Sequence, residues 1–217
     1  MLRNTIAFLI AWLFIQVASV SAQNLLNNPG FEKTGSGGTG SQSWKSDGSG
    51  TYSDTRDTTL PHSGVADEFL ETNGQGNNYA SMYQDTAAGS VIPGQNYDIN
   101  LYYASPDSNS YPSVEVNFLD ASNNNLGLGF GQSFDGGPDA VPNQYYFFDS
   151  GPFAAPAGAS SAQIIINGFT LTLSGLDGVH IDDVSFSQVP EPASISILGI
   201  AGFGMFARRR KFRQATI

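Results

Sequence analysis

The sequence predicts an all-β protein, a jelly-roll β-sandwich, with a signal peptide before it and a single transmembrane helix after it. Two observations favour the sandwich. Short apolar runs recur with Gly, Asn, Asp and Pro between them, and no run outside the two ends keeps a 3.6-residue apolar period. The composition agrees, since 13% of residues are charged, 40% are hydrophobic and 25 of 217 are glycine. This is typical of a loop-rich β protein and excludes a charge-rich disordered chain.

Six segments are predicted as strands: 79–86, 96–104, 113–119, 144–150, 162–168 and 179–186. In the third, Val114, Val116 and Phe118 alternate with Glu115 and Asn117, as expected of a strand with one buried face. The length leaves room for one such domain, which we place at residues 23–188.

Two connections are predicted between or beside these strands. Residues 120–125 are expected to form a hairpin loop. Residues 33–50 are rich in Gly, Ser and Thr and are expected to form a long loop around Trp44.

The N-terminus has the features of a secretory signal peptide, residues 1–22. Arg3 supplies a positive charge, and residues 6–15 form an uncharged apolar run. Small residues at Val20 and Ala22 predict cleavage before Gln23. The alternative is an uncleaved anchor, for which the apolar run is short.

The C-terminus combines three features at residues 189–213. Pro190, Glu191 and Pro192 are followed by an uncharged stretch, 193–207, and then by a basic cluster that includes Arg208, Arg209 and Arg210. A helix over the uncharged stretch spans roughly 22 Å, short of the ~30 Å hydrocarbon core, unless flanking residues or bilayer thinning cover the difference. The positive-inside rule places the basic end in the cytoplasm and the body of the chain outside it.

This order of features resembles the PEP-CTERM sorting signal of Gram-negative bacteria. The resemblance implies recognition by an exosortase, a membrane protease-transpeptidase, with processing near Pro190–Glu191–Pro192. Before processing, the C-terminal helix would hold the protein in the membrane. Proteins of this kind are linked to exopolysaccharide and biofilm production. The alternative is an ordinary tail anchor.

Charge and residue usage exclude several kinds of chemistry. The chain has no cysteine and two histidines, so it has neither disulfides nor thiolate metal sites. An isoelectric point near 4.3 argues against nucleic acid as a partner. Residues 23–189 contain three basic residues against 18 acidic ones, a net charge near −15. These carboxylates must be solvated, spread apart or bound to cations.

The body also resembles galactose-binding-domain-like jelly rolls, the fold of many carbohydrate-binding modules. The matching segments are 24–32 (NLLNNPGFE), 62–64 (HSG), 94–99 (GQNYDI), 114–126 and 178–186 (GVHIDDVSF). They occur in order over the whole body. They are more specific for the fold than for any ligand.

That resemblance implies a structural Ca²⁺ that links the first strand to the last. The corresponding positions here are Gly30, Glu32 and the pair Asp182 and Asp183. Calcium takes six to eight oxygen ligands, which carboxylates, carbonyls and water supply. Because successive side chains of a strand point to opposite faces, only one of the two aspartates need face the ion, and the sequence leaves open which one. The alternative is a set of solvated acids.

A second group of acids, Asp47, Asp54 and Asp57, lies in a polar segment. Its spacing does not fit an EF-hand, and neither does Asp120 with Asn124. We expect these to be solvated loop acids rather than a second ion site.

A sugar-binding site needs aromatic rings with convergent polar groups. The candidates are Trp44, Tyr52, Tyr103 and Tyr111, with many Asn and Gln residues in the same chain. The alternative is that these aromatic side chains belong to the core. One member of each adjacent pair, such as Tyr102 and Tyr103, is expected to point inward.

Catalysis is not expected. The sequence has no G-x-S-x-G and no H-E-x-x-H motif, and nothing selects a carboxylate pair for glycoside hydrolysis. We therefore expect an exported bacterial protein of the cell surface or extracellular matrix, with a non-catalytic sandwich that binds extracellular polysaccharide. The alternatives are a purely structural acidic matrix or coat protein and an extracellular polysaccharide hydrolase.

Overall fold

A computed structural model describes residues 22–35, 40–73, 78–106, 109–134, 141–171 and 177–190. Gln23–Val189 form one compact unit. The expected signal peptide apart from Ala22, the C-terminal helix 193–207, and Glu191, Pro192, Arg208, Arg209 and Arg210 lie outside the described residues. Within the described ranges no helix has the length and hydropathy needed to cross a membrane.

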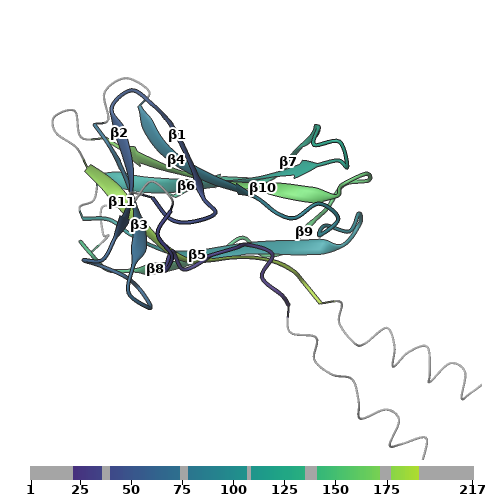
Figure 1. Cartoon of the computed structure of the whole chain (residues 1–217), viewed down its shortest axis with the longest axis horizontal. Helices are drawn as coiled ribbons and strands as arrows, with labels where there is room; N and C mark the ends of the chain where they lie inside the picture. The colour runs from purple at the N-terminus through teal and green to yellow at the C-terminus, as the bar shows by residue number, and fades with distance from the viewer. Residues whose placement is uncertain are drawn as a thin grey trace, which may run out of the picture. The chain divides into compact units, whose positions relative to one another are not determined.

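The unit is a sandwich of two antiparallel sheets, which confirms the predicted all-β sandwich (Figure 1). The first sheet, sheet 1, has the order β1-β4-β10-β6-β7. Its strands are β1 (Lys45–Ser49), β4 (Tyr79–Asp85), β10 (Ser161–Thr170), β6 (Ser110–Leu119) and β7 (Asn125–Ser133).

The second sheet, sheet 2, has the order β2-β3-β11-β5-β8, and the short strand β9 also pairs with β5. Its strands are β2 (Tyr52–Asp57), β3 (Asp67–Thr72), β11 (Asp177–Gln188), β5 (Asn96–Ala104), β8 (Tyr146–Asp149) and β9 (Phe153–Ala154). Figure 1 shows the two layers stacked, with β6, β7 and β10 of sheet 1 above β5 of sheet 2.

Alternation along the central strands builds the core between the sheets. Val114, Val116 and Phe118 of β6 are fully buried, as their spacing predicts. The Tyr97 ring of β5 stacks on Phe186 of the neighbouring strand β11, with ring centres 5.3 Å apart, and meets Phe118 of β6 edge-on at 6.2 Å. The Tyr97 hydroxyl accepts a hydrogen bond from the Ile92 N–H, so its one polar atom is satisfied inside the core.

The six predicted strands correspond to β4, β5, β6, β8, β10 and β11, while β1, β2, β3, β7 and β9 were not predicted. The single loop expected at 33–50 was wrong, because residues 45–49 form the edge strand β1. This strand carries no large apolar residue, so the sequence gives no alternating signal there. Residues 120–125 do form the β6–β7 turn, in which the Asp120 carboxylate accepts hydrogen bonds from the Ser122 and Asn124 N–H groups.

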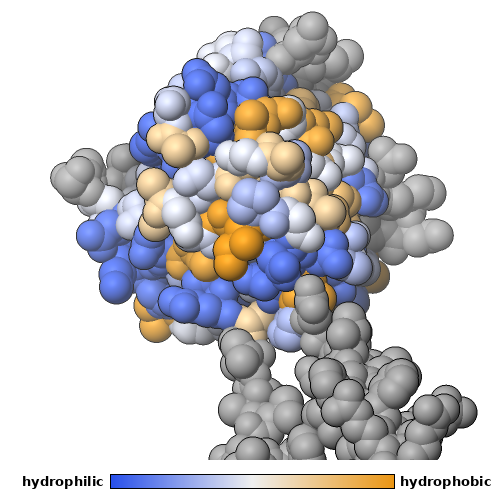
Figure 2. All heavy atoms as spheres, turned by 90° about the vertical axis from the view of Figure 1, so that its right-hand side faces the viewer, coloured by the Kyte–Doolittle hydropathy of each residue, from blue (hydrophilic) through white to orange (hydrophobic). Residues whose placement is uncertain are grey.

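Apolar side chains are also exposed on β7, the outermost strand of sheet 1. Leu128 is 62% exposed and Leu126 39%. Figure 2, which views the molecule from the side on which β7 lies in Figure 1, shows apolar residues in small groups separated by hydrophilic ones. This face therefore offers no single broad apolar patch.

One carboxylate faces inward. The Glu68 side chain of β3 is 1% exposed, and neither of its oxygens has a hydrogen-bond donor among the described residues. Burial, followed by the neighbouring carboxyl group of Asp54, raises the pKa of Glu68 from 4.5 to about 10. Glu68 is therefore protonated in the folded protein at neutral pH.

This burial predicts a pH-dependent gain in stability for Glu68→Gln. Because the folded-state pKa is raised, the contribution of Glu68 to stability is complete below pH 4.5 and is lost as pH rises toward about 10. Glutamine is neutral throughout, so the variant should melt higher than the wild type at pH 8, by roughly 2 °C or more, and show a smaller difference at pH 5.

Glu71→Gln is the matched control, because Glu71 lies on the same strand and is only half-buried. Thermal melts followed by circular dichroism, in EDTA, measure both variants. Equal shifts for the two variants at pH 8, or a Glu68→Gln difference that does not change with pH, would contradict the buried neutral carboxyl.

Candidate functional site

Three acidic side chains gather around the turn at residues 61–65, which leads into β3. Asp182 Oδ2 accepts hydrogen bonds from the His62 and Ser63 N–H groups at 2.9 and 3.0 Å. Asp183 Oδ1 accepts one from Ser63 Oγ, and its Oδ2 lies 2.8 Å from His62 Nδ1. Glu32 accepts a hydrogen bond from the Val65 N–H. The acids of the first and last segments thus hold one turn between them.

A β-bulge explains how two successive aspartates of one strand reach the same turn. The pairing of β11 with β5 shifts register between Asp182 and Ser185, and Asp183 has a φ of 49°. Strict alternation would bring only one of the pair to this turn, but the bulge breaks the alternation of side chains, so both carboxylates reach it. The Asp183 N–H donates to Asp182 Oδ1 at 2.7 Å.

Asp182 is fully buried, and this shapes its acidity. Burial raises its pKa to about 6, although the N–H groups of Ser63, Asp183 and His62 act in the opposite direction. The nearby charge of Asp183 adds to the rise. A buried carboxyl that ionises near pH 6 is suited to bind a cation, which would remove the cost of its charge.

The residues expected to hold Ca²⁺ fit a cation in part. Gly30 faces the aspartate pair, since a β-carbon there would lie 3.4 Å from Asp183 Oδ1 and 3.8 Å from Asp182 Oδ1. A side chain at residue 30 would fill this space. Glu32 lies at the same turn but bonds to Val65. Among the described residues, a different set of three side chains brings its possible ligand atoms within 4.8 Å of one another, and it contains none of these expected Ca²⁺ ligands.

That group is Asp57, Asp67 and His180, which come from β2, β3 and β11. Asp57 and Asp67 are cross-strand partners, and His180 pairs with Phe69 two residues along β3. His180 Nδ1 lies 2.7 Å from Asp67 Oδ2 and 3.8 Å from Asp57 Oδ2. The Phe69 ring stacks on the imidazole with centres 4.4 Å apart. We refer to these three residues as the Asp-Asp-His cluster.

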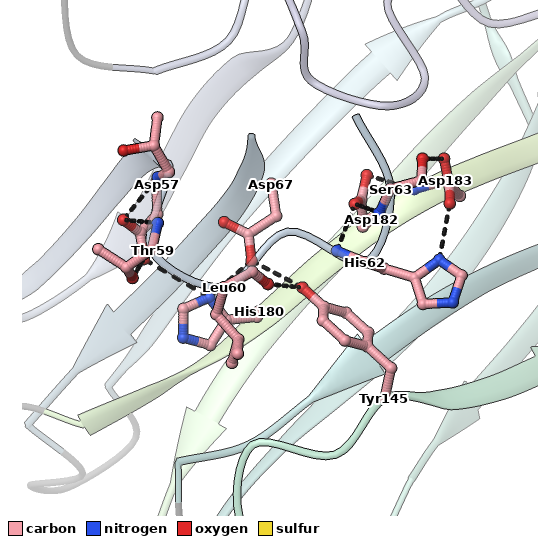
Figure 3. A network of polar contacts seen from close by, with 11 residues as sticks. Asp57, Thr59, Leu60, His62, Ser63, Asp67, Tyr145, His180, Asp182 and Asp183 are labelled. Carbon is pink, nitrogen blue, oxygen red and sulfur yellow. Dashed lines mark hydrogen bonds and ion pairs between the residues drawn. The ribbon is translucent and has the colours of Figure 1, made fainter. Parts of the chain in front are cut away.

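Tyr145 borders this cluster. Its hydroxyl lies 2.7 Å from Asp67 Oδ2 and 2.8 Å from the Leu60 carbonyl oxygen. Burial first, and then the hydrogen bond with Asp67, raise the pKa of Tyr145. Figure 3 shows Tyr145 between the Asp-Asp-His cluster and the His62 side chain, along one face of sheet 2. Tyr145 therefore stays protonated and supports the position of the Asp67 carboxylate.

Sequence reasoning missed Asp67 and His180 as partners of Asp57. It placed Asp57 in a polar loop, together with Asp47 and Asp54, whereas Asp54 and Asp57 lie in β2 and Asp47 in β1. The register of β2 with β3 brings Asp57 beside Asp67, and no local sequence motif predicts this register. A His two residues before the aspartate pair was the one available signal.

The outer face of sheet 1 carries a different set of side chains. Tyr79, Phe169 and Tyr111 form a row across β4, β10 and β6, with neighbouring ring centres 6.1 and 5.5 Å apart. All three are half-buried. Beside them Asn167 donates a hydrogen bond to Ser113 Oγ. We call this row the aromatic row.

Polar groups lie elsewhere on the same outer face of sheet 1. On β1, Lys45 pairs with Asp85 at 3.1 Å, and its ammonium group lies over the Tyr83 ring. A shallow hollow of about 220 Å³ lies between β6 and β7. Its lining includes Glu115 and Gln132. Planar rings next to amide, hydroxyl and carboxylate groups provide what sugar recognition requires.

The four aromatic residues expected to bind a ligand lie in different environments. Trp44 packs against Phe31 of the core, and its ring N–H donates to the Asn28 carbonyl. Tyr103 is half-buried beside Phe134 and Tyr146. Tyr52 is 39% exposed, and its ring lies against Gly48. Tyr111 alone among the four belongs to the aromatic row.

Comparison with known proteins identifies the C-terminal segment. Residues 188–211 match the PEP-CTERM protein-sorting motif. The chain therefore carries an exosortase sorting motif, which indicates an exported protein sorted to the cell surface. A search of curated proteins gave no match.

The sandwich is similar to several solved structures at low sequence identity. One is TmCBM61, solved in complex with β-1,4-galactotriose. The match has a TM-score of 0.51 and 12% identity, and it covers 77% of this chain and 99% of TmCBM61. Another is the CBM22-1 xylan-binding domain of Paenibacillus barcinonensis Xyn10C. The match has a TM-score of 0.51 and 11% identity, and it covers 81% of this chain and all of that domain.

A third similar structure is the enzymatically active domain of bacteriophage CBA120 tailspike protein 4. The TM-score is 0.58 and the identity 19%, over 76% of this chain. This chain spans only 21% of that domain's length. At these identities the likeness establishes the fold alone, and this fold is shared by carbohydrate-binding modules and by enzymatic domains, including the whole of a Stig cyclase from Fischerella sp. TAU.

The contact between Glu32 and the 61–65 turn predicts the effect of Gly64→Ala. Gly64 has a φ of +64°, and a β-carbon there would overlap the Glu32 carboxylate. Alanine should therefore cost the backbone strain of a positive φ, about 1–2 kcal/mol, and also the solvent-exposed hydrogen bond between Glu32 and Val65, about 0.5–1.5 kcal/mol.

Gly89→Ala separates the two costs. Gly89 has a φ of +78° and open space around the missing β-carbon, so it reports the backbone strain alone. Chemical denaturation should show Gly64→Ala to be the more destabilising variant. Equal losses in the two variants would mean that the Glu32 contact contributes nothing to stability.

Proposed function

We propose that the sandwich is a non-catalytic glycan-binding module of an exported, exosortase-sorted surface protein, and that extracellular polysaccharide is its partner. The observation that carries the proposal is the aromatic row of Tyr79, Phe169 and Tyr111 on the outer face of sheet 1. Two solved structures of the same fold are named for binding xylan or a galactotriose, which supports the choice of ligand class.

The geometry favours an extended chain of sugars. The three rings lie in sequence across β4, β10 and β6, so successive sugar residues can each contact one ring. Asn167 and Lys45 lie on the same face and offer groups to the hydroxyls. Because the three rings are only half-buried on the outer face of a sheet, contact with sugar C–H faces should dominate over enclosed hydrogen bonding.

Binding to a panel of soluble β-linked polysaccharides tests the proposal. Tyr111→Ala and Phe169→Ala should each weaken binding by about tenfold, the size of one lost aromatic contact. Phe147→Ala is the control, since Phe147 is 56% exposed but belongs to β8 of the opposite sheet.

Two outcomes would contradict it. One is the absence of selective binding to any member of the panel, which would favour the structural alternative below. The other is an equal loss in the control variant.

We further propose that the sandwich binds Ca²⁺ at Asp182 and Asp183, with Gly30 beside them and Glu32 joining after it leaves Val65. Two observations support this: both aspartates face one point near Gly30, and the buried Asp182 carboxyl has a raised pKa. The ion would neutralise these carboxylates and tie the N-terminal segment to β11.

Calcium should raise the melting temperature of the full chain, and the rise should depend on pH. Because the folded-state pKa of Asp182 is about 6, the carboxylate is ionised at pH 7.5 and largely protonated at pH 5. Without Ca²⁺, the contribution of Asp182 to the free energy of unfolding is lost as pH rises from 3.8 to about 6. Above that range, Ca²⁺ bound to the ionised carboxylate restores this stability. At a concentration of 100 times Kd the gain is about 2.7 kcal/mol.

Thermal melts at the two pH values, with Ca²⁺ or EDTA, measure this effect. Asp182→Asn should abolish the Ca²⁺ response, whereas Asp120→Asn, in the exposed β6–β7 turn, should leave it unchanged. A Ca²⁺ response of the same size at pH 5 and pH 7.5 would exclude Asp182 as a ligand.

A second candidate function is a structural acidic matrix or coat protein without a glycan site. The net charge near −15 over residues 23–189 favours it, because such a surface can be cross-linked by divalent ions. The aromatic row favours glycan binding over this candidate, since solvated acids alone do not require three aligned rings.

A further inference from the structure

The three residues of the Asp-Asp-His cluster take no part in the proposed glycan-binding site or in the proposed Ca²⁺ site. Asp57, Asp67 and His180 each offer one ligand atom, and these atoms lie within 4.8 Å of one another. They lie on the outer face of sheet 2, opposite the aromatic row. Figure 3 shows the cluster and the Asp182–Asp183 pair as separate groups along this face.

The buried charge of the cluster is incompletely satisfied. Asp67 is fully buried, and its Oδ1 has no hydrogen-bond partner among the described residues. Asp57 is its direct cross-strand neighbour, so two carboxylates lie side by side. A buried carboxylate oxygen without a donor is costly unless a cation or proton compensates it.

In the part of the chain that the structure describes, no Lys or Arg side chain next to the cluster supplies that compensation. Arg56 precedes Asp57, but alternation turns it to the other face of β2, where its guanidinium donates to the Phe31 and Glu32 carbonyl oxygens. From residue 57 to residue 207 the sequence contains no Lys or Arg. His180 is the one ionisable base within the group, and it faces two carboxylates.

We propose that Asp57, Asp67 and His180 bind a divalent transition ion of the Zn²⁺ class. An imidazole nitrogen with two carboxylate oxygens suits zinc and its neighbours, whereas Ca²⁺ and Mg²⁺ take oxygen ligands alone. Zinc lies about 2.0–2.2 Å from such ligands, which places ligand atoms up to roughly 4.2 Å apart. A small movement of the Asp57 side chain brings the three donors within that range.

The surroundings support a site with one open position. The Asp57 side chain is 23% exposed, while those of His180 and Asp67 are 7% and 0% exposed, so the site opens to solvent on the Asp57 side. Water can complete the coordination there. Tyr145 contacts Asp67 Oδ2 and positions the ligating carboxylate, as outer partners of metal ligands commonly do.

Titration calorimetry of the full chain tests the site directly. The protein is purified in detergent without a histidine tag, stripped with EDTA, and titrated with ZnCl₂ in the presence of excess Ca²⁺, which saturates the proposed Asp182–Asp183 site. One zinc should bind per chain. Asp57→Asn should weaken binding by roughly tenfold or more, because one of three ligands is lost.

Asp149→Asn is the matched control. Asp149 is an acid on β8 of the same sheet, its Oδ1 accepts a hydrogen bond from the Gly151 N–H, and it lies outside the cluster. Its zinc affinity should equal that of the wild type. Circular dichroism of the metal-free variants shows whether each is folded, and the following measurement on the wild type does not depend on any variant.

The chain has two histidines, so ¹⁵N imidazole spectra resolve both. Stoichiometric Zn²⁺ should shift the His180 ring nitrogens and leave those of His62 unchanged, since His62 bonds to Asp183 instead. Three results would overturn the proposal: no saturable zinc binding, a shift confined to His62, or an Asp57→Asn affinity equal to that of the wild type.

Discussion

The hydrogen bonds between the Asp182–Asp183 pair and the His62–Ser63 turn position much of sheet 2. The bulge in β11 sends both carboxylates to this turn, where they accept two backbone N–H groups, one hydroxyl and one imidazole contact. The turn leads directly into β3, which pairs with β11 on one side and β2 on the other. The placement of Asp67 beside Asp57 therefore depends on an interaction made several residues earlier in the chain.

This arrangement follows from a shortage of basic side chains. With three cations against 18 acids in residues 23–189, most carboxylates must be satisfied in other ways. Backbone N–H groups donate hydrogen bonds to the carboxylates of Asp120, Asp182 and Glu32. A proton serves Glu68, whose pKa lies far above its ordinary value. Oxygens that none of these groups reaches, such as Asp67 Oδ1, are the places where a bound cation would lower the free energy.

The central strands could be predicted from the sequence because burial on one face leaves a period of two. Strand β5 coincides with the predicted segment 96–104, and β6 begins three residues before the predicted start of 113. Strands β1 and β2 lie at sheet edges and have largely polar sequences, so no such period marks them. Strand β3 was missed because its sequence, DEFLET, contains three acids, of which two are buried.

The candidate sites also differ in how far the sequence predicts them. The grouping of Gly30 with Asp182 and Asp183 could be expected from a family resemblance, because those motifs lie at fixed ends of the fold. The Asp-Asp-His cluster could not, since it depends on the β2–β3 register, which no local residue pattern encodes. Likewise Tyr111 was a candidate by its residue type, whereas its alignment with Tyr79 and Phe169 comes from pairing across three strands.

The two faces of the sandwich are physically separate. The apolar core between the two sheets, which includes Leu70 and Val179 packed against Gly168, separates the aromatic row from the Asp-Asp-His cluster. An ion held by Asp57 and His180 therefore cannot coordinate a glycan that lies across β4, β10 and β6. Any influence of such an ion on glycan binding must act through the stability or geometry of the shared core, and packed cores transmit small displacements poorly unless they have a second discrete arrangement. For this reason metal binding and glycan binding are best regarded as independent properties of one exported domain.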